Sequence, residues 1–216
     1  MDTLLNNLDI FVEGFKNTLI LFFSSGAIAL VLGTIIGSMR VSPVPAMRAF
    51  GTVYVNLVRN TPLTLIMFFF AFGYPKLGFP KADYLVLALI ALSLYTATYV
   101  AEALRSGVNT VPVGQAEAAR AIGLGFVPTL TNVVLPQAFR GAIAPLGNVL
   151  IALTKNTTVV ATVGVAELSY TMKGMLETNS SLLYTIFFLI AICFVILTLP
   201  VGVLFTSLSR RLVVHR

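Results

Sequence analysis

The sequence predicts an all-α integral membrane protein with five transmembrane helices, and two observations support that prediction. Of the 216 residues, 57% are hydrophobic and only 10% are charged, and the mean hydropathy is +0.95, whereas about a quarter of the residues in soluble domains are charged. The charges are also unevenly spaced, because residues 17–39, 60–75, 84–101 and 178–209 contain none. Such runs reach or approach the roughly 20 apolar residues that a spanning helix needs.

The apolar runs divide a single transmembrane domain, residues 1–216, into five predicted spans. These spans cover about residues 15–39, 51–73, 84–106, 139–166 and 180–208. The first ends at Arg40, the second contains Pro62, and Lys155 interrupts the fourth.

Five spans place the two ends of the chain on opposite sides of the membrane, and the basic residues predict which side is which. One side would hold Arg40, Arg48, Arg105, Arg120, Arg140, Arg210, Arg211 and Arg216. The other would hold Lys16, Lys76, Lys81 and Lys173, together with acidic residues that include Glu167. Because Lys and Arg favour the cytoplasmic side, the N-terminus is expected outside and the C-terminus inside. Residues 107–138 then form the largest cytoplasmic loop.

Within that loop, the stretch GQAEAARAIG (114–123) predicts a short helix that is too polar and too short to span. Pro112 suits its first turn, and Gly123 can adopt the left-handed conformation that ends a helix. Glu117 and Arg120, three residues apart, can pair locally or reach groups on a partner. The residues leave two readings open: a helix that docks on another protein, and one that lies on the membrane surface.

Five segments in order resemble the polar amino acid branch of the ABC importer permeases. They are LVRNTPL (57–63), YVAEALRSG (99–107), VPVGQAEAARAIG (111–123), VVLPQAFRGAIAPLGN (133–148) and KNTTVV (155–160). The resemblance covers roughly residues 10–210 and implies the type I ABC importer permease fold. One departure is Asn156-Thr157-Thr158, where the branch often has Asp-Thr-Ser.

The resemblance also implies a role for the loop helix. Glu117-Ala118-Ala119 and Gly123, followed by Leu135-Pro136, match the EAA signature of the family. In that family the helix is a coupling helix seated in a cleft of the ATPase subunit. The coupling residues implied here are Gln115, Glu117, Ala118, Ala119, Arg120 and Gly123.

Charged residues inside apolar spans are costly, which makes them candidates for a transport path. The predicted path residues are Arg59, Asn60, Thr61, Tyr99, Glu102 and Lys155. Arg59 is suited to a substrate carboxylate and Glu102 to an ammonium group, and a net positive balance favours an acidic amino acid such as glutamate. The alternatives are an Arg59 at the membrane edge, an ion pair of Glu102 with Arg105 or Arg59, and an interfacial Lys155.

The sequence contains no GxxxxGK[ST] phosphate loop, HExxH motif or cysteine cluster, so no enzyme chemistry, cofactor or metal is expected in this chain. ATP and Mg²⁺ would be bound by a partner. The expected partners are a second permease subunit (identical or paralogous), two ABC ATPase subunits, an extracytoplasmic amino acid-binding protein and the lipid bilayer of a bacterial cell membrane, with no nucleic acid. Two rivals remain: an ATP-independent secondary transporter or channel, and a membrane anchor without a path.

Overall fold

The computed structural model describes residues 8–80 and 82–212, and the regular structure in these residues is helical. The α-helices are α2 (Leu8–Val41), α3 (Pro45–Arg59), α4 (Leu63–Phe68), α5 (Tyr84–Asn109), α6 (Val113–Ala121), α7 (Phe126–Thr129), α8 (Leu135–Asn156), α9 (Leu168–Thr178) and α10 (Leu183–Leu212). Two π-helical turns, η1 (Phe69–Gly73) and η3 (Leu130–Val134), and three 3₁₀ segments, η2 (Tyr74–Leu77), η4 (Thr157–Val163) and η5 (Ser180–Leu182), connect or extend them.

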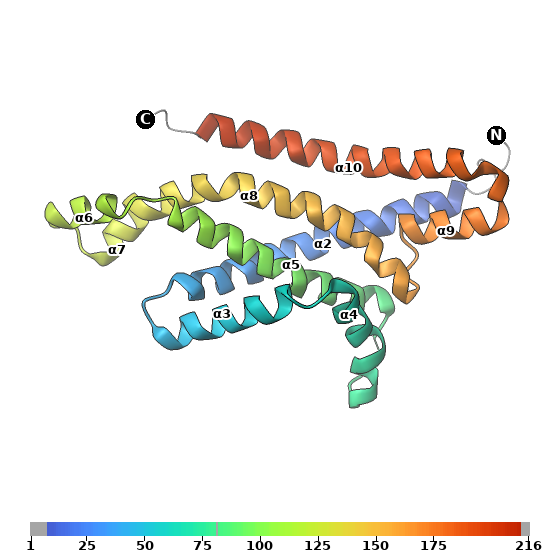
Figure 1. Cartoon of the computed structure of the whole chain (residues 1–216), viewed down its shortest axis with the longest axis horizontal. Helices are drawn as coiled ribbons and strands as arrows, with labels where there is room; N and C mark the ends of the chain where they lie inside the picture. The colour runs from blue at the N-terminus through green and yellow to red at the C-terminus, as the bar shows by residue number, and fades with distance from the viewer. Residues whose placement is uncertain (1–7, 81, 213–216) are drawn as a thin grey trace.

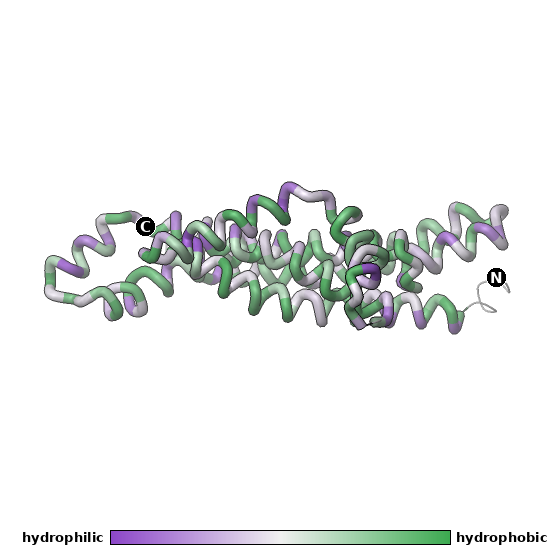
Figure 2. The backbone as a smooth tube through the Cα atoms, turned by 90° about the horizontal axis from the view of Figure 1, so that it is seen from below, coloured by the Kyte–Doolittle hydropathy of each residue, from purple (hydrophilic) through white to green (hydrophobic). Residues whose placement is uncertain are grey.

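The long helices lie side by side in an elongated bundle (Figure 1). Helix α8 packs between α10 and α5, and α5 packs against α2 along much of its length. The loop helices α6 and α7 project at one end of the bundle, whereas α9 lies at the other end, where α2 begins (Figure 1). Hydrophobic residues follow the central stretch of the bundle, and hydrophilic ones gather toward its two ends (Figure 2).

Within the described residues, four helical segments are long and apolar enough to cross a membrane: Leu8–Val41, Tyr84–Asn109, Phe126–Val163 and Ser180–Leu212. The third of these begins within the stretch expected to be loop, because α7, η3 and α8 continue one another from Phe126 onward. Lys155 does not interrupt it, since α8 runs to Asn156 and η4 continues to Val163.

The expected second span, residues 51–73, is not one straight helix. Helix α3 ends at Arg59, and the helical segment Leu63–Leu77 leaves it at an angle of 96°. Pro62 explains the break, because proline has no N–H to donate and disfavours the helical conformation of the residue before it, Thr61. The two pieces together would make the fifth crossing.

Glycines on α2 allow its close approach to α5. A Cβ added to Gly33 would lie 2.5 Å from Val100 Cβ, and one added to Gly37 would lie 3.3 Å from the Ala101 Cα. The small-residue face of the first span therefore packs within the subunit, where Ala29, Ala97 and Val100 share its buried core.

Candidate functional site

A cavity of about 320 Å³ lies between α5 and α8, and we call it the polar cavity because five of its seven lining residues carry a hydroxyl or an amide group. Its lining residues are Tyr95, Thr96 and Tyr99 of α5 and Asn148, Val149, Ala152 and Asn156 of α8. Because Asn148, Ala152 and Asn156 follow one another at intervals of four, they share one face of the helix. The volume falls within the range of about 300–1,000 Å³ that is typical of small-molecule sites.

The cavity offers several hydrogen-bonding groups to a ligand. The hydroxyls of Tyr95 and Tyr99 lie 2.9 Å apart. The Oγ1 atom of Thr96 has no hydrogen-bond partner among the described residues, but it is buried and so is not open to a ligand in this structure. Two amides, from Asn148 and Asn156, lie on the opposite wall.

Arg59 does not line this cavity, but it lies against Tyr99, which does. It is the last residue of α3, and its Cζ atom lies 5.6 Å from the centroid of the Tyr99 ring. At this distance the guanidinium is attracted to the face of the aromatic ring. Arg59 and Tyr99, two of the predicted path residues, are therefore brought together, although only Tyr99 lines the cavity.

Of the predicted path residues, only Tyr99 lines the cavity, and Asn60, Thr61 and Lys155 lie elsewhere. Asn60 and Thr61 lie at the break between α3 and α4, and the Thr61 hydroxyl donates to the carbonyl of Leu57 at 2.8 Å. The side chain of Lys155 is exposed outside the cavity, although its neighbour Asn156 lines it.

Glu102 lies on α5 three residues beyond Tyr99, does not line the cavity, and is held in an ion-pair network. One carboxylate oxygen pairs with Arg40 of α2, and the other accepts hydrogen bonds from Arg105, including one from its Nε at 3.2 Å. The sequence suggested Arg105 or Arg59 as the ion-pair partner of Glu102, and the structure confirms Arg105 but not Arg59. The second partner, Arg40, was not predicted. Because arginines bind both of its carboxylate oxygens, Glu102 links α5 to α2 through the ion pair with Arg40.

Sequence reasoning did not select Thr96, Asn148 or Asn156 as site residues. A signal was available for the two asparagines, because they are eight residues apart in a span and so lie close to one helix face. Thr96 gave no such signal, since serine and threonine hydroxyls in apolar helices usually bond to the preceding turn, as the Ser93 hydroxyl does to Leu89 O at 2.7 Å.

The second candidate site is the loop helix α6, Val113–Ala121, whose limits lie within two residues of the predicted stretch 114–123. Pro112 precedes its first residue, and Gly123 follows it with φ +88°. The Gly123 N–H donates to Arg120 O at 2.9 Å and the Leu124 N–H to Ala119 O at 3.1 Å. This pair of bonds is the Schellman arrangement, which requires a left-handed residue at the Gly123 position.

Most predicted coupling residues lie on the exposed surface of α6. Gln115, Glu117, Ala118 and Arg120 are exposed, whereas Ala119 is buried against the rest of the loop. Among the described residues, neither Glu117 nor Arg120 forms a salt bridge, so the local pair is not made. Large apolar side chains flank the helix at its two ends, where Val113 and Ile122 are 74% and 81% exposed.

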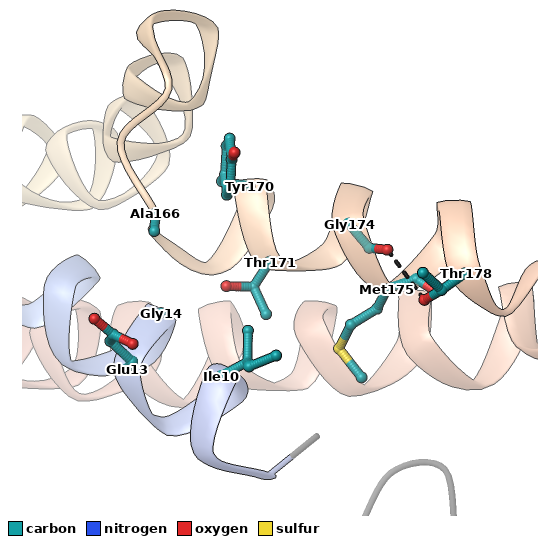
Figure 3. Close-up of a pocket in the computed structure, with 9 residues that line it drawn as sticks. All are labelled: Ile10, Glu13, Gly14, Ala166, Tyr170, Thr171, Gly174, Met175 and Thr178. Atoms are coloured by element: carbon teal, nitrogen blue, oxygen red, sulfur yellow. Dashed lines mark hydrogen bonds between the residues drawn. The ribbon is translucent and has the colours of Figure 1, made fainter. Parts of the chain in front are cut away.

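At the opposite end of the bundle, a cavity of about 250 Å³ lies between α2 and α9 (Figure 3). Glu13 and Ile10 line it from α2, and Tyr170, Thr171 and Met175 line it from α9 (Figure 3). Within the described residues, no group of three His, Cys, Asp or Glu side chains could hold a metal ion there or elsewhere.

Hydrogen bonds fix the beginning of α9 on α2. The Asn17 amide donates to Ala166 O at 2.7 Å, and the Leu168 N–H donates to the Thr18 hydroxyl at 3.1 Å. Between these contacts, Glu167 is fully buried and one carboxylate oxygen accepts from the Tyr170 N–H at 2.9 Å. Its other oxygen has no partner among the described residues, and burial raises the pKa of Glu167 to about 7.

The model of the family of binding-protein-dependent transport system inner membrane components matches residues 29–214. The chain belongs to this family. It is thus a multi-pass membrane permease with the type I ABC importer permease fold.

Named relatives of this permease share most of its length. It is 50% identical over 199 residues to a glutamate transport system permease protein of Corynebacterium glutamicum, covering 87% of each chain. It is 32% identical over 209 residues to a probable glutamine ABC transporter permease protein of Bacillus subtilis, covering 97% of this chain and 96% of that one.

Solved structures have the same fold. A chain in the crystal structure of an amino acid ABC transporter with histidines aligns with a TM-score of 0.86 and 26% identity over 96% of both chains. An inward-facing methionine ABC transporter chain aligns with a TM-score of 0.78 and 22% identity, covering 97% of this chain and 99% of that one.

Proposed function

We propose that this permease is the transmembrane subunit of an ATP-driven importer for a polar amino acid, and that its substrate is acidic, of the glutamate type. The observation that supports this most directly is the polar cavity between α5 and α8, with Arg59 against its lining residue Tyr99. The 50% identity to a glutamate permease points to the same substrate.

The charges around the cavity favour an anionic substrate. Arg59 lies against Tyr99, which lines the cavity. Glu102, the carboxylate expected to attract an ammonium group, is already bound by Arg40 and Arg105. With that carboxylate engaged elsewhere, the side-chain carboxylate of glutamate would meet a guanidinium, and a cationic side chain would meet repulsion.

The importer would contain a second permease copy, identical or paralogous, two ATPase subunits and an extracytoplasmic binding protein. The ATPases would bind ATP and Mg²⁺. We further propose that α6 faces the cytoplasm, with the C-terminus inside and the N-terminus outside, as the distribution of Arg and Lys favours. Helix α9 would then lie on the side where the binding protein delivers substrate.

Helix α6 would couple the permease to the ATPase. Its support is the exposed, unpaired side chains of Glu117 and Arg120 in the described part of the chain, flanked by the exposed Val113 and Ile122. Two opposite charges between two apolar anchors can bind a complementary groove through both kinds of contact. ATP would favour one arrangement of the transmembrane helices, and α6 would transmit that preference.

The test is ATP hydrolysis by material that co-purifies with a tagged copy of this chain from its native membranes. We expect vanadate-sensitive hydrolysis that glutamate and the extracytoplasmic fraction stimulate. Glu117→Lys should lose at least tenfold of this activity, because it places two positive charges on one face of α6. Glu177→Lys, the same charge reversal at an exposed position of α9, serves as the matched control for expression and insertion.

Two results would contradict the proposal. Glutamate uptake that continues without any associated hydrolysis would favour the ATP-independent transporter. If Glu117→Lys hydrolysed ATP and took up glutamate as the parent does, α6 would not be the helix that couples the permease to the ATPase.

A further inference from the structure

The cavity of about 250 Å³ at the end of the bundle opposite α6 is lined by polar groups from two helices, Glu13 of α2 and Thr171 of α9 (Figures 1 and 3). We refer to it as the α2–α9 cavity. Ile10 of α2 and Met175 of α9 give it apolar walls. Its volume lies below the range of about 300–1,000 Å³ that is typical of small-molecule sites, so it suits a single side chain better than a larger molecule.

The hydroxyl group of Thr171 reaches this cavity without a hydrogen-bond partner among the described residues. Thr171 is only 3% exposed, and its backbone N–H donates to Glu167 O at 2.9 Å. Unlike the Oγ1 atom of Thr96, its hydroxyl oxygen is not closed off in the described chain. A Cβ at Gly14 would clash with this oxygen, so the glycine lets the hydroxyl point toward α2 (Figure 3). A polar group of this kind is available to a ligand.

Glu13 supplies the charge of the α2–α9 cavity. Its side chain is exposed, and it forms no salt bridge in the part of the chain that the structure describes. The nearest basic residues along the two helices, Lys16 and Lys173, do not line the cavity. A carboxylate beside a hydroxyl that has no partner favours a cation that can donate hydrogen bonds.

A primary ammonium group matches these acceptors. It has three N–H donors, and the two carboxylate oxygens of Glu13 with the Thr171 hydroxyl offer three acceptors. The methylene groups of a lysine side chain would lie against Ile10 and Met175 while the ammonium reaches the polar groups. A guanidinium has five N–H donors and would leave more of them unpaired in the same site. Glutamate, with its two carboxylates, would be repelled by Glu13.

We propose that the α2–α9 cavity binds the ammonium group of a lysine side chain that the extracytoplasmic binding protein presents. The choice of partner rests on the proposed function, which puts this end of the bundle on the side where that protein delivers substrate. Hydrogen bonds through Asn17 and Thr18 already hold the beginning of α9 on α2. A lysine bound between the two helices would therefore meet a preorganised surface, which lowers the entropic cost of binding.

The ammonium site itself is tested on the purified importer complex with n-butylammonium, which has the head and the methylene stem of a lysine side chain. Saturation-transfer NMR compares its binding with that of n-butanol, an uncharged probe of the same chain length. We expect n-butylammonium to bind more tightly, and Glu13→Gln to weaken its binding roughly fivefold, because the opposite charge is lost at a partly exposed site.

Two further variants separate the hydroxyl contact from general effects of substitution on α9. Thr171→Val removes a hydroxyl that has no partner in the described chain, so it should keep the fold and weaken n-butylammonium binding about two- to threefold. Glu177→Gln removes an exposed carboxylate of α9 that does not line the cavity, and it should bind both probes as the parent does.

The source of the ammonium is tested by adding the binding protein and a carbodiimide. The carbodiimide activates a carboxylate, and attack by an adjacent amine forms an amide bond while the urea leaves with one carboxylate oxygen. We expect mass spectrometry to find Glu13 joined to a lysine of the binding protein, and Glu13→Gln to lose this cross-link. The concentration of binding protein that half-maximally stimulates ATP hydrolysis should rise roughly fivefold in Glu13→Gln, and the difference should shrink as salt is added.

Different results would overturn the two parts of the proposal. Equal binding of n-butylammonium and n-butanol, or equal binding of n-butylammonium by the parent and Glu13→Gln, would overturn the ammonium site. A cross-link from Glu13 to an amino group of a permease chain, or an unchanged half-maximal concentration in Glu13→Gln, would overturn the assignment to the binding protein. Failure of the proposed function would look different, because the parent complex would show no stimulated hydrolysis while n-butylammonium still bound.

Discussion

At the scale of single residues, the candidate site is defined by which charges are paired. Glu102 is bound by Arg40 and Arg105, whereas Arg59 lies over the ring of Tyr99. The contact of Glu102 with Arg105, three residues away, could be predicted because helix geometry alone brings the two together. Its contact with Arg40, 62 residues away, depends on how α2 and α5 pack, and no local pattern encodes that.

Substitutions of Arg59 and Lys155, both predicted path residues, test which of the two side chains contributes to the transport path. We expect Arg59→Gln to lower the apparent affinity for glutamate roughly 10- to 100-fold, since losing a hydrogen bond to a charged group costs about 1.5–3 kcal/mol. Lys155→Gln should change it less than about threefold, because that side chain is exposed, whereas Arg59 lies against Tyr99 in the cavity wall. Uptake of labelled glutamate by cells or proteoliposomes measures both, and equal losses in the two variants would return Lys155 to the path.

At the scale of elements, the sequence predicts best where the determinants are local. Pro112 and Gly123 bound α6 because each acts through its own backbone conformation. Pro62 likewise marks a weak point in the second span. The 96° between α3 and the helix after Pro62 could not be predicted, because the packing of α4 on α5 and η4 fixes that angle.

The end of α6 can be tested at Gly123, whose φ is +88°. Gly123→Asn should largely preserve hydrolysis by the importer, since asparagine tolerates the left-handed conformation better than other residues with a side chain. Gly123→Val should lose most of it, because a β-branched residue strains this conformation by about 1–2 kcal/mol or more and frays the last turn.

Hydrolysis by the co-purified ATPase, normalised to the amount bound, measures both variants. A Cβ at Gly123 would meet no atom within 4 Å in the described chain, so a loss specific to valine reflects backbone conformation. Equal activity in the two variants would contradict this account.

At the scale of the whole molecule, the fold class followed from composition because apolar length is what a bilayer requires. Which polar groups are buried at the ends of the bundle could not be predicted in the same way. Glu167 was expected on an extracytoplasmic surface, yet it is fully buried where α9 meets α2. Long-range packing, which composition does not report, places it there.

The stability of the fold should therefore depend on the ionisation of Glu167. Its folded pKa, about 7, lies above the ordinary value of 4.5, so the folded state holds the proton more tightly. The resulting stabilisation is fully present below about pH 4.5 and is lost as the pH rises through about 7. We expect the thermal midpoint of the purified protein to fall between pH 5 and pH 8 by a few degrees more in the parent than in Glu167→Gln, since about 1 kcal/mol corresponds to about 2–4 °C at this size.

The matched control is Glu177→Gln, at an exposed position on the same helix, which should keep the pH dependence of the parent. Parallel midpoint curves for the parent and Glu167→Gln would show that the buried carboxyl does not titrate in this range.

Helix α8 begins beside the loop that carries α6 and ends at the polar cavity, so a tilt of α8 at the loop can displace its end at the cavity. From Leu135 to Asn156 it is about 32 Å long, so a tilt of about 5° at the loop end shifts the cavity end by about 3 Å. That shift equals the length of a hydrogen bond, enough to make or break the contacts of Asn156 with a ligand. Pro145 leaves one carbonyl of the preceding turn without a donor, so α8 can bend most easily at this residue. A rigid helix with one flexible point at Pro145 would therefore convert a small tilt at the loop end into a change in which ligands the cavity can bind.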